Sequence, residues 1–415
     1  MSAPQPSSPS MHPVDLDAVE RELDTLWRET NAAVAASGGN AYSRNSVLTL
    51  VSFLQGQSQP ARIMDAIHRL TTTHPSRAVV VVADSQQKSA DLRASVGTFV
   101  APESTCYGED ILLDASGDAV QHLPGAILPL IVSGLPAFLW WVGEPPWGTA
   151  LLESLVDGVD RLIVDTSEMP SVERSLTALD DLMRRKKSRC VVSDISWSAQ
   201  APWREITAQF FDPLNLRPYL EEIDRVVIEF AAGEEDAPTN PSQAYLFAGW
   251  LASRLNWRSE LAQHTAMLDD SREHILRSAG GRKISLELNA RFNVPQQSWW
   301  ARPVDQATSS SGHHPAPHRA VSVRHGALMS VHIEARTPDA RATFTAAREH
   351  DLVHATTRCN VPEGSPPSQS VHLESIGEGS PLGDQLRVFG QDMVYQEALN
   401  AAAQFVRPSL RRGII

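Results

Sequence analysis

Histidine pairs are the residues of this chain whose spacing could place a metal ion. His350 and His354 have the His-x-x-x-His spacing of a zinc-binding helix, with Asp351 where a metalloprotease carries its glutamate base. The flanking residues are rich in threonine and favour a strand, in which positions four apart lie roughly 13 Å from each other and cannot share one ion. A second group lies in a Ser/Pro-rich segment typical of a solvated loop, and comprises His313, His314 and His318. We therefore expect no metal site in either segment.

A short polar motif precedes the hydrophobic run from 78 to 83. It consists of His74, Pro75, Ser76 and Arg77, and the proline forces an extended conformation on the residue before it. Ser76 and Arg77 could hold a phosphate or a carboxylate of a partner through charge-assisted hydrogen bonds. Alternatively, the motif caps a strand and Arg77 pairs with a neighbouring acid.

A second group of charged residues flanks the short hydrophobic run from 162 to 164. Arg161 precedes this run and Asp165 follows it. The carboxyl end of a strand is where α/β folds place ligand-facing groups, so Asp165 is a candidate for a binding site. A salt bridge explains the same residues equally well. The chain has no Gly-x-Gly-x-x-Gly, Gly-x-x-x-x-Gly-Lys-Ser/Thr or Gly-x-Ser-x-Gly motif, so we expect no cofactor and no esterase chemistry.

Seven of the ten tryptophans fall in three short stretches, 135–147, 194–205 and 249–257. Tryptophan carries a large apolar area with one polar handle, which suits both thick cores and the anchors of protein interfaces. Trp140 and Trp141 are adjacent on a predicted strand and point to opposite faces, so helices on both sides would bury them in a core. The candidates for exposed anchors lie beside prolines and arginines: Trp147, Trp203 with Arg204, Trp299 and Trp300.

The elements that must position these residues alternate between strands and helices up to about residue 257. Runs rich in β-branched residues predict strands at 47–53, 78–83, 111–113, 137–142, 162–164, 190–192 and 226–230. An amphipathic first helix is predicted at 15–36, and helical patterns between the strands cover 61–70, 119–132, 151–156, 171–187, 202–211 and 243–255. This alternation predicts an α/β domain over residues 14–260, with a largely parallel sheet covered by helices. Residues 1–13 are expected to form a disordered tail.

From about Gly280 the pattern changes to an alternation of polar and apolar residues. Segments 283–292, 320–335, 343–359 and 370–374 predict antiparallel strands with one face in water, and 385–406 predicts a closing helix. We expect a smaller α+β domain over residues 275–415, with a flexible loop at 304–317.

Composition limits the class of partner. A formal net charge of -13 repels phosphate backbones and anionic membrane surfaces, so we expect no nucleic acid and no membrane partner. The uncharged stretch 123–142 has the length of a membrane span, but its three prolines argue against one continuous helix. The N-terminus has no secretory pattern, and the cysteines are too few for a disulfide framework, so a reducing cytoplasm is expected. The cysteines are Cys106, Cys190 and Cys359.

Several motifs follow one another between about Ser46 and Trp257: HPSR, CYGEDILL, LPAFLWWVGEPP, VDRLIVDTSE, DISW with PWRE, and QAYLFAGWLASRLNW. In this order they resemble the OpcA family of glucose-6-phosphate dehydrogenase assembly proteins, of the cyanobacterial type. The C-terminal third resembles the family more loosely and ends in a GQDMVYQEAL helix. Ala199 stands where the family pattern has an arginine two residues after Trp197, so a partner contact at that position is not carried over.

The resemblance implies a non-enzymatic cytoplasmic factor of the oxidative pentose phosphate pathway. Such a factor binds glucose-6-phosphate dehydrogenase, favours its active oligomer as an allosteric activator and needs no cofactor of its own. The alternative is a sugar-phosphate enzyme or sensor, such as a phosphogluconolactonase-like hydrolase, with His74, Arg77 and Asp165 around its ligand.

Overall fold

The computed structural model describes residues 12–13, 15–36, 46–56, 60–71, 73–100, 107–185, 190–260, 271–298, 322–338, 340–362, 364–373, 381–387 and 390–407. The chain divides into two compact units, each assembled from separate segments. The first comprises Met1–Val164, Lys186–Ser193 and Leu382–Gly390, and the second Asp165–Arg185, Asp194–Pro381 and Gln391–Ile415. The division first falls after Val164, well before the boundary near 260–275 that the sequence suggests. The observed division differs from the predicted boundary because the strand at 223–231 pairs with later strands and not with strands of the first sheet.

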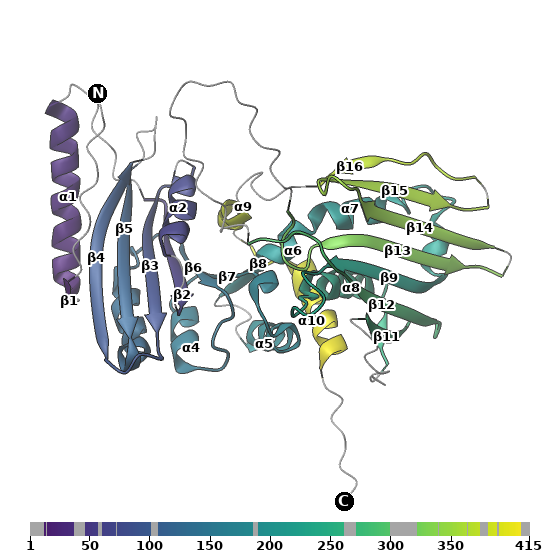
Figure 1. Cartoon of the computed structure of the whole chain (residues 1–415), viewed down its shortest axis with the longest axis horizontal. Coiled ribbons are helices and arrows are strands. Elements are labelled where there is room, and N and C mark those ends of the chain that lie inside the picture. Colours follow the sequence, from purple (N-terminus) through teal and green to yellow (C-terminus); the bar gives the residue numbers. More distant parts are fainter. Residues whose placement is uncertain are drawn as a thin grey trace, which may run out of the picture. The chain divides into compact units, whose positions relative to one another are not determined.

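The first sheet contains β1 (His12–Pro13), β2 (Leu48–Gln55), β3 (Ser76–Asp84), β4 (Asp91–Val100), β5 (Tyr107–Ser116), β6 (Ala137–Val142), β7 (Arg161–Val164) and β8 (Val191–Asp194). Their order across the sheet is β1-β4-β5-β3-β2-β6-β7-β8 (Figure 1). Parallel pairs join β5, β3, β2, β6 and β7, whereas β4 is antiparallel to β5. Without β1 and β4, the strands follow the order 3-2-1-4-5-6 of doubly wound nucleotide-binding sheets. The predicted α/β layer is thus confirmed, and β4 is a strand that the sequence analysis missed.

The helices that accompany the first sheet are α1 (Leu16–Ala36), α2 (Pro60–Thr71), α3 (Leu123–Ile127), α4 (Ala150–Asp157) and α9 (Pro381–Arg387). Helix α1 packs along β4 and buries Val19 and Leu23, as its amphipathic pattern predicts. The continuous helix predicted at 119–132 is wrong, because 3-10 helices at Gly117–His122 and Leu128–Leu130 flank α3. Pro124 and Pro129 each lie in the first turn of a new short helix, where a missing N–H is tolerated.

The second sheet contains β9 (Ile223–Ala231), β10 (Arg258–Ser259), β11 (Ser271–Arg277), β12 (Lys283–Arg291), β13 (Leu328–Arg336), β14 (Arg341–Arg348), β15 (His354–Asn360) and β16 (Ser370–His372). Their order is β10-β11-β12-β9-β13-β14-β15-β16. Only the pairing of β9 with β12 is parallel among these described strands. The predicted α+β architecture with antiparallel strands is therefore confirmed.

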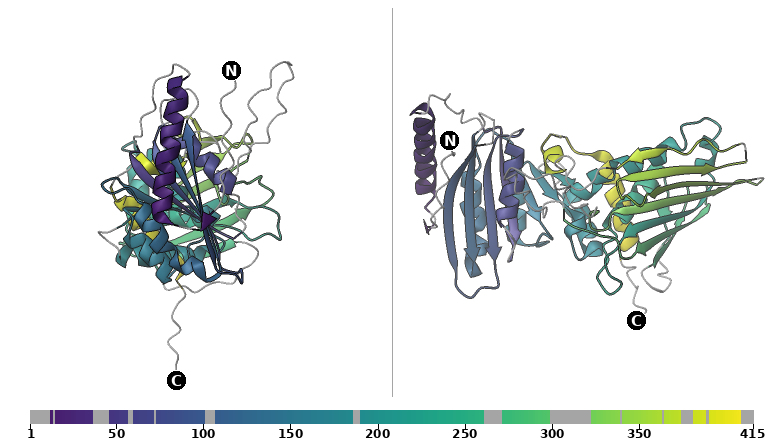
Figure 2. Two further views of the ribbon diagram at one scale, coloured as in Figure 1. Left: turned by 90° about the vertical axis from the view of Figure 1, so that its left-hand side faces the viewer. Right: turned by 45° about the horizontal axis from the view of Figure 1, so that its top comes forward.

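The helices of the second unit are α5 (Val172–Arg185), α6 (Ile195–Ala199), α7 (Ala201–Gln209), α8 (Ser242–Arg254) and α10 (Met393–Val406). Of these, α7, α8 and α10 lie on one face of the second sheet (Figures 1 and 2). The rings of Phe211 on the loop after α7 and Phe344 on β14 lie 4.7 Å apart, and Phe405 on α10 contacts His274 on β11. The single closing helix predicted at 385–406 is instead α9 and α10, because Asp392 caps a new helix by accepting from the backbone N of Tyr395.

Two further predictions from the sequence concern the tryptophans Trp140 and Trp141 in the first sheet and the strand expected through His350. Trp140 and Trp141 on β6 are 1% and 0% exposed, which confirms their place in the core. The strand predicted through His350 is wrong, because residues 349–353 form the turn between β14 and β15. His354 begins β15 and its ring Nδ1 lies 2.6 Å from Asp351 Oδ2, so this histidine pair does not lie on a helix. The segment with His313, His314 and His318 lies outside the described residues.

None of the helices in the described ranges combines the length and the apolar character that crossing a membrane requires.

Candidate functional site

Arg77 is buried at the start of β3 and is held by two acids. Its Nε donates to Glu109 Oε2 on β5 at 2.8 Å, and its Nη1 donates to Glu20 Oε1 on α1 at 2.6 Å. Burial by itself lowers the pKa of Arg77, but the hydrogen bonds and charges of Glu20 and Glu109 outweigh it and raise that pKa. Arg77 therefore fastens α1 to the first sheet, in the way that the neighbouring-acid alternative predicts.

The other candidates near the strand starts of the first sheet also have structural contacts. His74 is half-buried in the turn before β3, and its Nδ1 lies 2.9 Å from Thr73 Oγ1. Ser76 is buried on β3. Arg161 is 3% exposed, donates to Ser193 on β8 and donates to the carbonyl of Gly390 at 3.3 Å. Arg161 therefore links β7 to β8 and to the segment at 390.

The chain leaves β7 and β8 through the same short motif, Asp-x-Ser. Asp165 Oδ1 accepts from Ser167 Oγ at 2.6 Å and from Ser196 Oγ at 2.8 Å. Asp194 Oδ1 accepts from the backbone N of Ser196 at 2.9 Å, and its Oδ2 accepts from Thr166 Oγ1 at 2.8 Å. We call Asp165, Ser167, Asp194 and Ser196 the Asp-x-Ser cluster, which lies in the second unit.

The Asp-x-Ser cluster is buried and acidic. Asp165 and Asp194 are 3% and 1% exposed, and no described residue bonds to Asp165 Oδ2. Burial first, and then the charge of Asp165, raises the pKa of Asp194 to about 7. The same two causes raise the pKa of Glu168 to about 7, although Ser298 donates to its Oε2 at 2.7 Å. The pKa values of Asp194 and Glu168 therefore lie close to neutral pH.

A tryptophan and an arginine join this cluster to helix α10. Trp197 Nε1 donates to Asp392 Oδ2 at 2.8 Å, and the Tyr395 hydroxyl donates to Asp194 Oδ2 at 3.4 Å. The guanidinium of Arg204 lies 3.6 Å from the centre of the Trp197 ring, and burial lowers the pKa of Arg204 to about 10. The VDTSE, DISW, PWRE and QDMVY motifs thus meet in the second unit. Arg204 is half-buried and holds this junction, and its contact with a partner stays a prediction.

The tryptophan candidates differ in exposure. Trp203 is 2% exposed, so its expected role as an exposed anchor is wrong for the conformation described. Trp147 is half-buried in the loop after β6, where its Nε1 donates to Glu144 Oε1 at 3.2 Å. Trp299 and Trp300 lie outside the described residues. Contact between any candidate and a partner stays a prediction, for which Trp147 and His74 offer the more accessible side chains.

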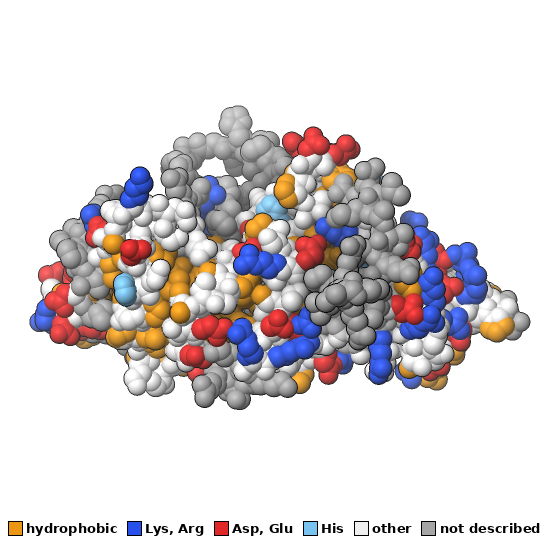
Figure 3. Space-filling view, turned by 90° about the horizontal axis from the view of Figure 1, so that it is seen from below, with side chains coloured by type: hydrophobic (Ala, Val, Ile, Leu, Met, Phe, Trp, Pro, Cys, Tyr) orange, Lys and Arg blue, Asp and Glu red, His pale blue; other side chains and the backbone are white. Residues whose placement is uncertain are grey.

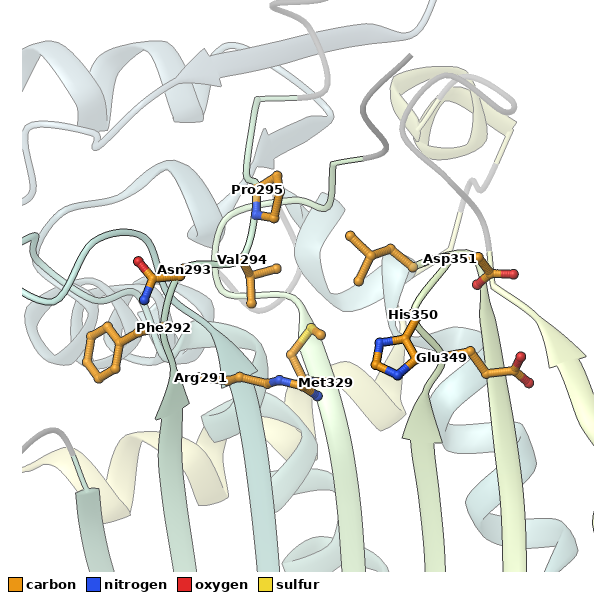
Figure 4. A pocket seen from close by; sticks show the side chains of 10 residues that line it. Arg291, Phe292, Asn293, Val294, Pro295, Met329, Glu349, His350 and Asp351 are labelled. Carbon is orange, nitrogen blue, oxygen red and sulfur yellow. The ribbon is translucent and has the colours of Figure 1, made fainter. Parts of the chain in front are cut away.

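A cavity of about 480 Å³ lies where β12 and β13 meet the β14–β15 turn. Figure 4 shows Arg291 and His350 at this cavity, with Met329 between them. Asn293 and Leu352, both at its rim, have positive φ angles of 59° and 62°, a region that residues other than glycine rarely adopt. The polar lining offers mixed charges without a nucleophile and base in contact, so we assign this cavity no reaction.

The described residues offer structural hydrogen bonds and two carboxyl groups with raised pKa, Glu168 and Asp194. No three His, Cys, Asp or Glu side chains in the described part of the chain are arranged to hold a metal ion. The sequence after β2 runs through Gln55 and Gly56 to Pro60, without the glycine fingerprint that approaches a pyrophosphate. Asp194 and Ser196 are not among the candidates predicted from the sequence, although two predicted strands are each followed by Asp-x-Ser.

Two family models match this chain. The first, described as the N-terminal domain of a glucose-6-phosphate dehydrogenase subunit, matches residues 67–181. The second, described as the C-terminal domain of the same subunit, matches residues 190–399. Both models carry the name OpcA.

Curated relatives share the family name. The chain is 35% identical over 193 residues to an OxPP cycle protein OpcA of Synechocystis, a match that covers 45% of this chain and 38% of that protein. A second OpcA, from Synechococcus elongatus, is 25% identical over 305 residues, which covers 72% of this chain and 60% of that protein. The matches thus span less than two thirds of either relative.

The fold also matches solved structures at low similarity. An oxidoreductase from Thermotoga maritima is 11% identical, with a TM-score of 0.40 over 87% of this chain and 96% of that one. A likeness of this degree carries no argument about chemistry. The C-terminal family model alone spans more than half of the 415 residues, and with the N-terminal model it places this chain in the OpcA family.

Proposed function

We propose that this chain is a non-enzymatic factor that binds glucose-6-phosphate dehydrogenase and favours its active oligomer. The observation that carries the proposal is the family match, because both matched models are described as parts of a glucose-6-phosphate dehydrogenase subunit. The name of the Synechocystis relative refers to the OxPP cycle, which agrees with a role beside that dehydrogenase in the cytoplasm.

The geometry of the family motifs supports a structural use for them. Asp165 accepts from Ser196, and Asp194 accepts from Thr166 and from Tyr395 in the first turn of α10. Trp197 donates to Asp392, and Arg204 donates to the backbone carbonyl of Trp197. Residues so engaged hold the junction together, which leaves them little capacity to bind and turn over a ligand. A partner would therefore meet the outside of this junction, and not the motif residues themselves.

An activator of this kind works through a difference in affinity. It shifts an equilibrium between inactive and active oligomers only by the factor with which it binds the active form better. A coupling of about 1 to 3 kcal/mol corresponds to roughly 5-fold to 150-fold activation. An interface that supplies this coupling buries roughly 1,200 Å² or more.

The test uses the dehydrogenase of the same organism at subsaturating glucose 6-phosphate. We expect added chain to raise its activity and to saturate at a fixed stoichiometry, while the chain alone turns over neither glucose 6-phosphate, NADP nor the lactone. Turnover of the lactone by the chain alone, with no effect on the dehydrogenase, would contradict the proposal and favour a hydrolase.

A pair of variants locates the contact. Trp147→Ala removes a half-buried ring in the first unit, and Trp250→Ala removes a half-buried ring in the second. If Trp147 is an anchor, its variant raises the concentration for half-maximal activation and the Trp250 variant leaves it unchanged. Equal effects of both variants would refute the assignment of Trp147.

A further inference from the structure

The second sheet has one face that no described helix or strand covers, opposite the face that α7, α8 and α10 occupy (Figure 2). On β9, Val226 and Ile228 are fully buried on the helix side, whereas Arg225 and Val227 alternate with them and are half-exposed. The same alternation holds on β11, β12, β13, β14 and β15. We call this surface of six strands the open face. Antiparallel sheets often leave such a face in water, so exposure alone assigns it no partner.

The strand register arranges the side chains of the open face in rows across the sheet. The central row runs from β11 to β15 through Glu273, Glu287, Val227, His332, Thr345 and Arg358. Its acidic members lie on β11 and β12, and its arginine lies on β15. The row is therefore negative at one end and positive at the other. Glu273 and Arg358 are both exposed.

A second row, one step along the strands, carries its charges at the centre. Arg225 on β9 lies directly beside Glu334 on β13, and the two are joined by a hydrogen bond of 2.9 Å from Nη1 to Oε1. A two-fold axis along the strands, between β9 and β13, exchanges β9 with β13 and β11 with β15 of another copy. It brings Glu273 opposite Arg358 of the second copy, whereas Glu334, which is 5% exposed, keeps its ion pairs with Arg225 and Arg341 of its own copy.

We propose that the open face binds the open face of a second copy of this chain. A two-fold interface is self-complementary, so every favourable pair occurs twice. The operation places Glu273 and Arg358, the exposed charges at the two ends of the central row, each against an opposite charge. This pattern favours a second copy over an unrelated partner, whose surface would have to carry a positive and a negative charge at the same separation. Figure 3 shows basic and acidic side chains intermingled over the second unit.

The size of the open face fits a stable dimer. Six strands at about 4.8 Å spacing give a width of about 29 Å, and strands of seven residues give a length of about 23 Å. The flat footprint is then about 670 Å², close to the roughly 800 Å² per partner of standard interfaces. The strand directions of two sheets that pack face to face differ by about 30°. The long side chain of Arg358 can span the displacement that this rotation causes at the edge of the sheet.

One like-charge pair arises, and it lies at the rim. The two-fold operation brings Lys283 near Arg341, but Arg341 already forms an ion pair with Glu334. That ion pair offsets the charge of Arg341, so its approach to Lys283 has little effect on affinity. The pairs formed by Glu273 and Arg358, which occur twice in the dimer, therefore decide the preference.

Sedimentation of the full chain tests the proposal independently of the proposed function. We expect a monomer–dimer equilibrium in the wild type, and a dissociation constant raised by at least about tenfold in Glu273→Arg or Arg358→Glu, because each places like charges in contact. The double variant Glu273→Arg, Arg358→Glu restores opposite charges and should dimerise within about threefold of the wild type. The control Arg93→Glu makes the same charge change on β4, outside the face, and should have no effect.

Three results would overturn the proposal. One is a wild type that stays monomeric up to about 100 µM, well above the Kd of a standard-sized interface. Another is a dimer that both single variants retain. The third is a double variant no better than the singles, with thermal melts showing that all variants are folded. If the chain is monomeric and Arg358→Glu abolishes binding to the dehydrogenase, the open face belongs to that partner and self-association is wrong.

Discussion

Replacing Asp194 with asparagine should stabilise the second unit at neutral pH and leave it unchanged in acid. The asparagine keeps the shape of the side chain, and its carbonyl can accept the bonds that Thr166 N and Ser196 N donate to Asp194 Oδ1. Its amide replaces Oδ2, which Thr166 Oγ1 and the Tyr395 hydroxyl contact, and both of those oxygens can accept a hydrogen bond. The substitution therefore removes the ionisable group with little change in packing.

The magnitude follows from the pKa. Burial and the charge of Asp165 raise the pKa of Asp194 to about 7, roughly three units above that of an aspartate in an unfolded chain. Between about pH 4 and pH 7 the native state holds a proton that the unfolded state has released, so stability falls as pH rises. Three units correspond to about 4 kcal/mol. The advantage of Asp194→Asn should grow from near zero at about pH 4 to about 4 kcal/mol above pH 7.

Urea unfolding of the wild type and the variant at several pH values measures this difference. Other acids with raised pKa, such as Glu168, are present in both proteins, so their contributions to the pH dependence of stability largely cancel when the two proteins are compared. The control Asp194→Ala also removes the ionisable group, but it loses the cap of α6 and the bonds to Thr166, so it should be less stable than Asp194→Asn by about 1 to 3 kcal/mol at every pH. A difference between wild type and Asp194→Asn that does not change with pH would refute the reasoning, because it would mean that Asp194 is ionised in the native state.

Further substitutions test the packing. Gly249→Ala should lower the melting temperature strongly, because its Cβ would lie 2.2 Å from the carbonyl oxygen of Ala398 on α10, whereas Gly125→Ala on α3 meets nothing within 4 Å and should be tolerated. Trp203→Ala should cost about 3 to 5 kcal/mol in unfolding experiments as a core lesion, and a cost below about 1 kcal/mol would contradict its burial. Arg77→Met should lower the free energy of unfolding by about 3 to 5 kcal/mol, because it leaves the buried carboxylate of Glu109 without its guanidinium partner. Glu20→Gln should lower it less, because the Glu20 side chain is 45% exposed. Equal losses in the two variants would contradict this ranking.

Much of the fold follows from local patterns in the sequence. The β-branched runs at 78–83 and 137–142 are buried on both faces, so they are recognisable without tertiary information. Strand β4 was missed because Asp91–Val100 mixes small and polar residues, and its pairing with β5 forms a hairpin that only the tertiary structure reveals. The role of β9 was also hidden, because its sequence resembles the parallel strands while its partners lie at least 50 residues further along the chain.

The candidate site was predictable only in part. The sequence identified Asp165 and Arg77 as notable but could not show that Glu20 and Glu109, far apart in the chain, neutralise Arg77. Trp203 and Arg204 resembled surface anchors because they lie beside a proline, but Arg204 stacks on Trp197 and Trp203 is buried. Such contacts depend on α6, α7 and α10 coming together, which no local pattern encodes.

The most direct test of the central claim is calorimetry of this chain with its own glucose-6-phosphate dehydrogenase, with and without glucose 6-phosphate. Coupling between binding sites is reciprocal, so the factor by which the substrate tightens the complex must equal the factor by which this chain tightens the binding of the substrate. We expect complex formation at micromolar concentrations or below and a factor of roughly 5 to 150 that agrees between the two measurements. An absence of heat and of kinetic response at those concentrations would contradict the account.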